Sequence, residues 1–186
     1  MTGFAFCGSF CSHKASLGVL SEFLEKGCDI LPIMSEKVYS TDTRFGKAED
    51  FIKTVAELTG KEPVHTIEDA EPIGPKIKLD ALIICPCTGN TAAKMAHGIC
   101  DTSVTMAAKA HLRNERPLVL AYASNDALSM SAPNIGLLLQ RKNVYFVPLA
   151  QDAPDMKPRS MVCDFTRVYE TYQNALSGRQ TQKIFF

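Results

Sequence analysis

The chain has no excess charge of either sign and no long hydrophobic run. Lysine plus arginine and aspartate plus glutamate each total 20, so the formal net charge at pH 7 is zero. A balanced chain lacks the electropositive surface that binding to nucleic acids or acidic membranes requires. No apolar stretch approaches the roughly 20 residues of a membrane-spanning helix. We therefore expect neither nucleic acid nor a membrane among its partners.

Export signals and metal-ligand spacings are also missing. The first residues, MTGFAFCGSFCSHK, contain no basic segment followed by a long apolar one, so we expect no signal peptide. Seven cysteines, an odd number, indicate reduced thiols in the cytoplasm rather than disulfides. A single residue separates Cys85 from Cys87, too few for the usual zinc spacing, so we expect no metal site and expect Cys85 to be buried.

What the sequence does contain is an alternation of strand-like and helix-like segments over 186 residues, the length of one domain. Short apolar runs predict strands at Phe4–Cys7, Asp29–Met34, Val64–Ile67, Ala81–Cys85, Pro117–Tyr122 and Val144–Val147. Amphipathic spacing predicts helices at Ser12–Lys26, Lys47–Thr59, Thr91–His97, Val104–Arg113, Ala132–Arg141 and Phe165–Leu176. We expect Pro86 to end its strand, Gln151–Arg159 to be a polar segment, and residues 178–186 to be a disordered tail.

This alternation predicts an α/β fold, a three-layer Rossmann-like (flavodoxin-like) parallel sheet with helices on both faces. Ligands of such sheets bind outside the carboxyl ends of the strands. The loops most relevant to chemistry are therefore 8–14, 35–47, 86–91 and 123–132.

The most informative segment runs from Asp80 to Thr102, DALIICPCTGNTAAKMAHGICDT. A buried strand there leads into a helix through Thr88, Gly89, Asn90 and Thr91. Free N–H groups and the helix dipole favour a negative group at such a helix N-terminus. The segment therefore predicts an anion or cofactor site, although an ordinary capped turn has the same sequence pattern.

The loop after the first strand supplies Gly8, Ser9, Phe10 and Cys11 to this candidate site. It lacks the G-x-G-x-x-G fingerprint, so a mononucleotide or flavin phosphate suits it better than a dinucleotide. Phe10 would lie beside a planar ring. The alternative interpretation makes Ser12 a simple helix cap and Phe10 a core residue.

Two further loops bring polar side chains to the same end of the sheet. The long loop after the second strand carries Ser35, and its Arg44 and Lys47 suit a small anionic substrate. After the fifth strand, Asn125 can hold an amide or carbonyl of a ligand. The alternatives are a solvated loop with Asp42 paired to Arg44, and Asn125 as a plain turn residue.

These pieces resemble the flavoprotein family that contains the flavin-dependent cysteine decarboxylases and the prenyl-flavin enzymes. The family pattern A-P-x-[ST]-x-N-T-x-x-K-x-A-x-G-x-x-D stands here as residues 85–101, CPCTGNTAAKMAHGICD. The resemblance implies a single domain over residues 1–186, a homo-oligomer, and bound flavin mononucleotide (FMN). It places the FMN contacts on Gly8, Ser9, Ser35, Thr88, Asn90 and Thr91.

A second resemblance, to the family of dipicolinate synthase B subunits, covers almost the whole chain. Its carrying segments are TDTRFGKAED (41–50), EPIGPK (71–76), TGN (88–90), MAAK (106–109), LRNERP (112–117), SNDAL (124–128), KNVYFV (142–147) and QDAPDMKP (151–158). It implies oxidation of dihydrodipicolinate to pyridine-2,6-dicarboxylate in the mother-cell cytoplasm of a sporulating bacterium. It also implies that the A subunit of dipicolinate synthase is a partner, through which alone NAD(P) would enter, and that Arg44 and Lys47 hold a dicarboxylate.

The sequence departs from the decarboxylases after the fifth strand. Their P-x-M-N pattern reads Tyr122-Ala123-Ser124-Asn125 here, with only the asparagine kept. Decarboxylation of a cysteine-containing substrate is therefore the weakest of three hypotheses. The others are an FMN-dependent oxidoreductase component and a non-catalytic assembly component that supports the A subunit. No catalytic residue is assigned.

Overall fold

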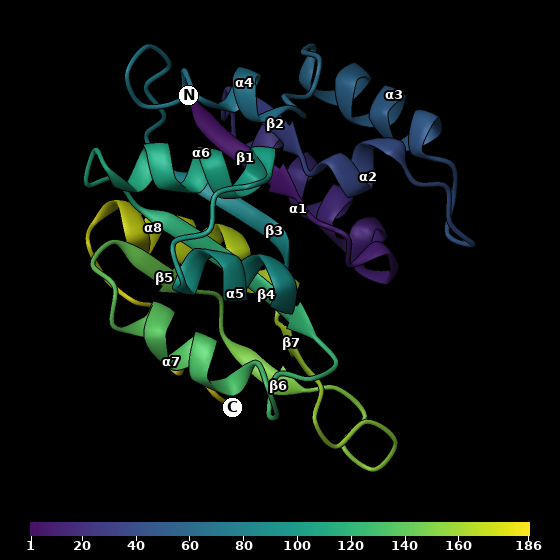
Figure 1. Ribbon diagram of the computed structural model, residues 1–186, viewed down its shortest axis with the longest axis vertical. Coiled ribbons are helices and arrows are strands. Elements are labelled where there is room, and N and C mark those ends of the chain that lie inside the picture. The colour runs from purple at the N-terminus through teal and green to yellow at the C-terminus, as the bar shows by residue number, and fades with distance from the viewer.

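The computed structural model describes residues 1–186, which form one seven-stranded sheet with helices on both faces (Figure 1). The strands are β1 (Thr2–Phe6), β2 (Ile30–Met34), β3 (Leu82–Thr88), β4 (Leu118–Ser124), β5 (Val144–Phe146), β6 (Leu149–Gln151) and β7 (Met161–Cys163). The α-helices are α1 (His13–Glu25), α2 (Glu36–Ser40), α3 (Ala48–Thr59), α4 (Ile67–Ala70), α5 (Gly89–Ala96), α6 (Ser103–Leu112), α7 (Ala132–Leu139) and α8 (Val168–Leu176).

Five parallel strands form the body of the sheet in the order β2-β1-β3-β4-β5. This is the flavodoxin-like order, so the predicted fold class is confirmed. The chain moves outward from β1 to β2 and then crosses to β3 on the other side of β1. The crevice between β1 and β3 is therefore the topological switch point, where ligands of open α/β sheets bind.

The helices form two layers around a continuous core. In Figure 1, α5, α6 and α7 lie in front of the sheet and α8 lies behind it, where it packs against α1. All five residues of β1 are buried, and so are six of the seven residues of β3. These strands are apolar on both faces because both faces are covered, as the sequence predicted. No helix of the structure combines the length and apolarity needed to cross a bilayer.

One predicted strand is absent, and one predicted strand end is wrong. Val64 makes only an isolated bridge to Ile33, and the predicted strand at Val64–Ile67 gives way to α4. The Thr66 side chain accepts a hydrogen bond from Asp69 N at 3.1 Å and so starts a helical turn. Pro86 does not end β3, because pairing with β4 resumes at Cys87 after a register shift.

The predicted polar segment 151–159 is part of an antiparallel hairpin. Its strands, β6 and β7, pair with each other, and β7 pairs with the last two residues of β4, Ala123 and Ser124. The first half of β4 pairs instead with β5. The hairpin therefore extends the sheet beyond the end of β5, and its loop projects from the lower right of the molecule in Figure 1.

The predicted disordered tail, residues 178–186, is instead held against the sheet. Leu149 N donates to Ile184 O at 2.7 Å, and Phe186 N donates to Leu149 O at 3.2 Å. The side chain of Gln180 bonds both backbone groups of Phe146, and Thr181 is buried. Hydrogen bonds to the backbone of β5 and β6 therefore hold residues 178–186 in place. The polar composition of this segment did not predict that order.

Candidate functional site

The carboxyl ends of β1 and β3 lie side by side, and the chain leaves both through polar turns. β1 continues through Gly8 and Ser9 into a short 3-10 turn, η1 (Phe10–Ser12), which leads into α1. β3 continues directly into α5, whose first residue is Gly89. These two turns face each other across the switch point.

Thr88 and Thr91 organise the start of α5. The Thr88 hydroxyl accepts a hydrogen bond from Thr91 N at 3.2 Å and donates one to the Thr91 hydroxyl at 3.0 Å. The Thr91 hydroxyl in turn donates to the Cys7 thiol at 3.3 Å. By helix geometry, the N–H groups of Gly89 and Asn90 have no acceptor within α5, so they remain available to an anion.

A hollow of about 940 Å³ lies in front of this helix start, and we call it the hydroxyl-rich hollow. Ile67 is the only hydrophobic residue in its lining. Seven hydroxyl side chains line it: Ser35, Ser40, Thr41, Thr66, Thr88, Thr91 and Thr102. Such a donor set suits a polyhydroxylated or phosphorylated group rather than an apolar ring.

The charged side chains of the hydroxyl-rich hollow are mostly engaged. Lys94 forms an ion pair with Asp101 at 2.8 Å, and hydrogen bonding from Lys94 lowers the pKa of Asp101. The Glu36 carboxylate accepts a hydrogen bond from Ser103 N at 2.8 Å and so helps to start α6. Lys37 and Glu68 form no ion pair, so the hollow contains one unpaired cation and one unpaired carboxylate.

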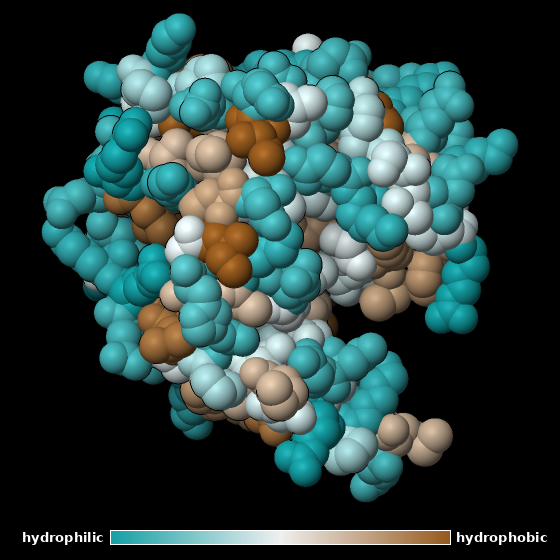
Figure 2. All heavy atoms as spheres, viewed as in Figure 1, coloured by the Kyte–Doolittle hydropathy of each residue, from teal (hydrophilic) through white to brown (hydrophobic).

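A second hollow, of about 540 Å³, lies between the two turns and the β6–β7 hairpin, and we call it the hairpin-side hollow. Figure 2 shows the molecule hollowed on the side where the hairpin loop projects. The lining of the hairpin-side hollow combines apolar side chains, among them Phe10, Phe45 and Met161, with the polar Arg44 and Asn125. Gly8, Thr88 and Asn90 line both hollows and therefore join them.

A polar cluster closes one wall of the hairpin-side hollow. Asp126 accepts hydrogen bonds from Ser124 at 2.5 Å and from Ser131 at 3.0 Å, and these bonds lower the pKa of its carboxyl. A Cβ atom at Gly89 would lie 2.6 Å from the Ser124 hydroxyl oxygen. The turn after β4 thus reaches the start of α5 only because residue 89 has no side chain. The Tyr122 hydroxyl is buried nearby in β4 without a hydrogen-bond partner.

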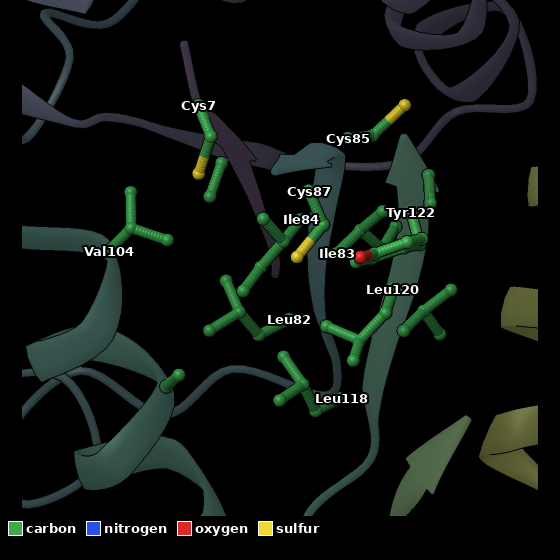
Figure 3. Close-up of a cluster of buried hydrophobic side chains, with 14 of the residues drawn as sticks. Cys7, Leu82, Ile83, Ile84, Cys85, Cys87, Val104, Leu118, Leu120 and Tyr122 are labelled. Atoms are coloured by element: carbon green, nitrogen blue, oxygen red, sulfur yellow. The ribbon is translucent and has the colours of Figure 1, made fainter. Parts of the chain in front are cut away.

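Three buried cysteines lie beneath the site, on β3 and just after β1. Figure 3 shows Cys7, Cys85 and Cys87 among the apolar side chains of the core. Burial raises the pKa of Cys7 to about 11 and that of Cys85 to about 12, and it raises the pKa of Cys87 well above its usual value. These thiols are therefore neutral and unreactive at pH 7. The predicted burial of Cys85 is confirmed.

The structure brings together every residue that the sequence assigned to the cofactor. Gly8, Thr88 and Asn90 line both hollows, Ser35 and Thr91 line the hydroxyl-rich hollow, and Ser9, Phe10, Cys11, Gly89 and Asn125 line the hairpin-side hollow. Their contact with a cofactor stays a prediction.

The two predicted substrate cations are separated. Arg44 lines the hairpin-side hollow, and its guanidinium lies 4.9 Å from the centre of the Phe45 ring. Lys47 lines neither of the two hollows, because its backbone precedes α3 and turns away toward α1. The structure therefore does not support a single clamp made by both side chains.

Sequence reasoning missed several lining residues. Thr66 was placed in a strand, although Thr66 followed by Asp69 is a recognisable helix-start pattern. Asp152, Lys157 and Ser160 come from the hairpin loop, and no local pattern in that segment marks them as part of a site. The structure has no group of three or more His, Cys, Asp or Glu side chains that could hold a metal ion.

The chain matches one protein family and one curated protein over almost its whole length. Residues 3–173 match the sequence profile of the family described as Flavoprotein. The dipicolinate synthase B subunit of Bacillus subtilis (strain 168) is 41% identical over 182 residues, which are 98% of this chain and 91% of that protein.

Solved structures show the same fold. The crystal structure of the dipicolinate synthase B subunit from Bacillus halodurans C superposes with a TM-score of 0.91 and 38% identity, covering 100% of this chain and 95% of that one. The FMN-dependent cysteine decarboxylase SpaF gives a TM-score of 0.66 at 22% identity, covering 95% and 94%. At that identity the second likeness shows the fold alone.

Proposed function

This chain belongs to the flavoprotein family, and from that premise we propose that it binds FMN across the two joined hollows. We further propose that it acts as the B subunit of a dipicolinate synthase, taking part in the oxidation of dihydrodipicolinate to pyridine-2,6-dicarboxylate. Its similarity to the Bacillus subtilis protein over 98% of the chain supports this assignment. Partnership with an A subunit, a homo-oligomeric state and action in the mother-cell cytoplasm during sporulation belong to the same proposal.

The observation that carries the proposal is the contrast between the two hollows. FMN has a polar ribityl phosphate at one end and a flat, largely apolar ring at the other. The hydroxyl-rich hollow, with its single hydrophobic residue, suits the first. The hairpin-side hollow, with Phe10, Phe45 and Met161, suits the second. Gly8 and Asn90 would lie alongside the middle of the molecule.

Each end of the cofactor would lie against side chains that suit its chemistry. Ser35 would hold the phosphate end with its hydroxyl, assisted by the N-terminus of α5 and by Lys37. Thr88 and Thr91, whose hydroxyls donate to Thr91 and Cys7, would line this end and fix the start of the helix. Phe10 and Asn125 would hold the ring, one by stacking and the other by hydrogen bonds. Bound flavin supplies the two-electron acceptor that this oxidation needs.

The protein's own part in the reaction is to hold and orient the substrate. Arg44 is exposed at the hairpin-side hollow and has no carboxylate partner, so its planar guanidinium is free to bind a substrate carboxylate. The β6–β7 hairpin forms the opposite wall of the hairpin-side hollow. NAD(P) would take part only through the A subunit, since the turn after β1 lacks the dinucleotide fingerprint.

The test is a flavin titration of the purified chain, with and without the A subunit, followed by visible absorbance and quenching of flavin fluorescence. Saturable binding supports an FMN-dependent oxidation. Failure to bind in both conditions would contradict the proposal and leave the chain as an assembly component.

Asn90→Ala should weaken flavin binding by about 1–3 kcal/mol, the cost of one or two lost hydrogen bonds. Gln173→Ala, which removes an exposed amide on α8, is the matched control and should bind normally. An unchanged flavin affinity in Asn90→Ala would remove this side chain from the site.

A further inference from the structure

A third hollow, of about 370 Å³, lies between η1, the start of α1 and the segment that leads into α3, and we call it the aromatic hollow. Seven of its twelve lining residues are hydrophobic. The lining consists of Phe10, Cys11, His13, Lys14, Leu17, Val38, Thr43, Phe45, Gly46, Lys47, Ala48 and Phe51. No other hollow described above has so large an apolar share.

Flat rings form much of this lining. The rings of His13 and Phe51 are stacked with centroids 4.4 Å apart, and the ring of Phe10 lies 5.1 Å from that of His13. His13 Nε2 lies 2.9 Å from Cys7 O, and burial lowers the pKa of its imidazole, so the ring is neutral and fixed in place. Phe45 is 55% exposed, a large apolar surface left open to solvent.

The charges of the aromatic hollow are all positive. Lys14 and Lys47 line it, no aspartate or glutamate does, and neither lysine forms an ion pair. The nearby Asp42 accepts a hydrogen bond from Ala48 N at 2.9 Å, so it is engaged at the start of α3. By contrast, the hydroxyl-rich and hairpin-side hollows each contain at least two carboxylates.

The aromatic hollow adjoins the proposed flavin site. Phe10, Cys11 and Phe45 line both it and the hairpin-side hollow. A ligand in the aromatic hollow would therefore be separated from the ring end of the cofactor by these side chains alone. Arg44, at the edge of the hairpin-side hollow, adds a third unpaired cation to the neighbourhood.

We propose that the aromatic hollow binds a planar ring carboxylate, with the ring against Phe10, His13 and Phe51 and its carboxylates near Lys14 and Lys47. Apolar rings and unpaired cations together select such a ligand over a neutral ring or an aliphatic acid. That this ligand is the product of the oxidation, held beside the flavin site rather than against the flavin ring, rests on the proposed function. Its chemical class rests on the hollow alone.

The test is a calorimetric titration of the full chain with pyridine-2,6-dicarboxylate, without FMN and with it. Binding should saturate at one site, and Lys47→Gln or Lys14→Gln should each raise the Kd about tenfold, as expected for one lost charged contact. Lys53→Gln, which removes the same charge from α3 outside the hollow, is the control and should leave the Kd unchanged. cis-Cyclohexane-1,3-dicarboxylate, with equal charge but no flat ring, should bind more weakly.

Cys11 provides a second readout that does not depend on activity. It is an exposed thiol in the lining of the hollow, whereas Cys28 and Cys100 are partly buried elsewhere. Pyridine-2,6-dicarboxylate should slow alkylation of Cys11 by iodoacetamide, measured by peptide mass spectrometry, and leave the rates at Cys28 and Cys100 unchanged.

The outcomes separate this proposal from the proposed function. If the Lys14 and Lys47 variants bound the ligand with the same Kd as the Lys53 control, the ring-carboxylate site would be overturned even if FMN binds. The same conclusion would follow if the ligand did not protect Cys11. Lysine-dependent binding in a chain that never takes up FMN would support the site and contradict the flavin proposal. Protection of Cys11 in the ligand-free protein that disappears on dilution would show a second copy seated in the hollow, and would overturn the proposal.

Discussion

At the scale of single residues, Gly89 is the position where the site tolerates no side chain. A Cβ atom there would lie 2.6 Å from the Ser124 hydroxyl oxygen, 3.0 Å from that of Ser131 and 3.2 Å from an Asp126 oxygen. These groups are bonded to one another and cannot move independently. Gly89→Ala should therefore lower the free energy of unfolding by about 1–3 kcal/mol, measured by urea denaturation.

Gly18→Ala is the matched control for that substitution. Gly18 lies on the exposed side of α1, and a Cβ atom there would meet nothing within 4 Å. Alanine in a helix interior is favoured over glycine by about 0.5–1 kcal/mol. The control should therefore stabilise the protein. If both substitutions stabilised it, the close approach at Gly89 would be refuted.

The half-buried His13 and the buried His111 should make the stability depend on pH. Nε2 of His13 lies 2.9 Å from Cys7 O and that of His111 lies 2.9 Å from Pro117 O, while burial lowers the pKa of both. In the unfolded chain these groups take up protons near pH 6.5, but in the folded protein only at lower pH. Below pH 6.5 the unfolded state thus binds more protons, so the free energy of unfolding should fall as pH drops from 7.5 to about 5.5.

Urea denaturation across that pH range checks the prediction. The double variant His13→Gln, His111→Gln should show a smaller pH slope than the native chain, whatever its absolute stability. His97→Gln changes an exposed histidine and should leave the slope in place. A slope that is equal in the double variant and the native chain would contradict the assignment to these two residues.

At the scale of elements, the start of α6 shows how a short polar pattern fixes a helix end. The Thr102 hydroxyl accepts a hydrogen bond from Thr105 N at 3.1 Å, and the Thr105 hydroxyl accepts one from Thr102 N at 3.1 Å. Thr102→Ala removes one half of this capping box and should cost about 1 kcal/mol in the free energy of unfolding. Thr54→Ala, in an exposed interior position of α3, is the control and should cost much less. Equal costs would show that the cap contributes nothing.

The elements that sequence reasoning identified correctly share one physical property. β1, β3 and β4 are continuous apolar runs because both of their faces are covered, so their pattern is visible without knowing what covers them. β6 and β7 are three-residue strands whose only distinctive property is their pairing partner. Their formation depends on the free edge that β4 offers beyond the end of β5.

At the scale of the whole molecule, the C-terminal segment is held to the sheet by the side chain of Gln180. Its amide makes two hydrogen bonds to the backbone of β5, as a neighbouring strand would. Gln180 Oε1 accepts a hydrogen bond from Phe146 N at 2.9 Å, and its Nε2 donates one to Phe146 O at 2.6 Å. Gln180→Ala leaves these buried backbone groups unpaired and should cost about 1–3 kcal/mol. Amide hydrogen exchange should also become faster over residues 181–186.

Gln182→Ala is the control for the C-terminal segment, since this side chain is exposed and makes no hydrogen bond. It should leave both stability and exchange unchanged. Fast exchange over residues 181–186 in the native chain would mean that the segment is not docked in solution, and would contradict the structure described above.

The sequence by itself determined the fold class and indicated which residues converge at the candidate site. Alternating apolar runs and amphipathic segments specify a parallel sheet, and the helix start at Thr88–Thr91 carries its own capping signal. Because all parallel strands end at one edge, residues as far apart as Gly8, Ser35 and Asn125 could be predicted to converge.

Only the tertiary structure decided how those residues divide into separate hollows. Arg44 and Lys47 are three positions apart, yet they line different hollows, because Lys47 immediately precedes α3, which packs toward α1. The hairpin wall and the docked C-terminal segment were likewise invisible in the sequence. Local patterns encode which face of an element is buried, whereas the partner that covers it is fixed by contacts between residues distant in the chain.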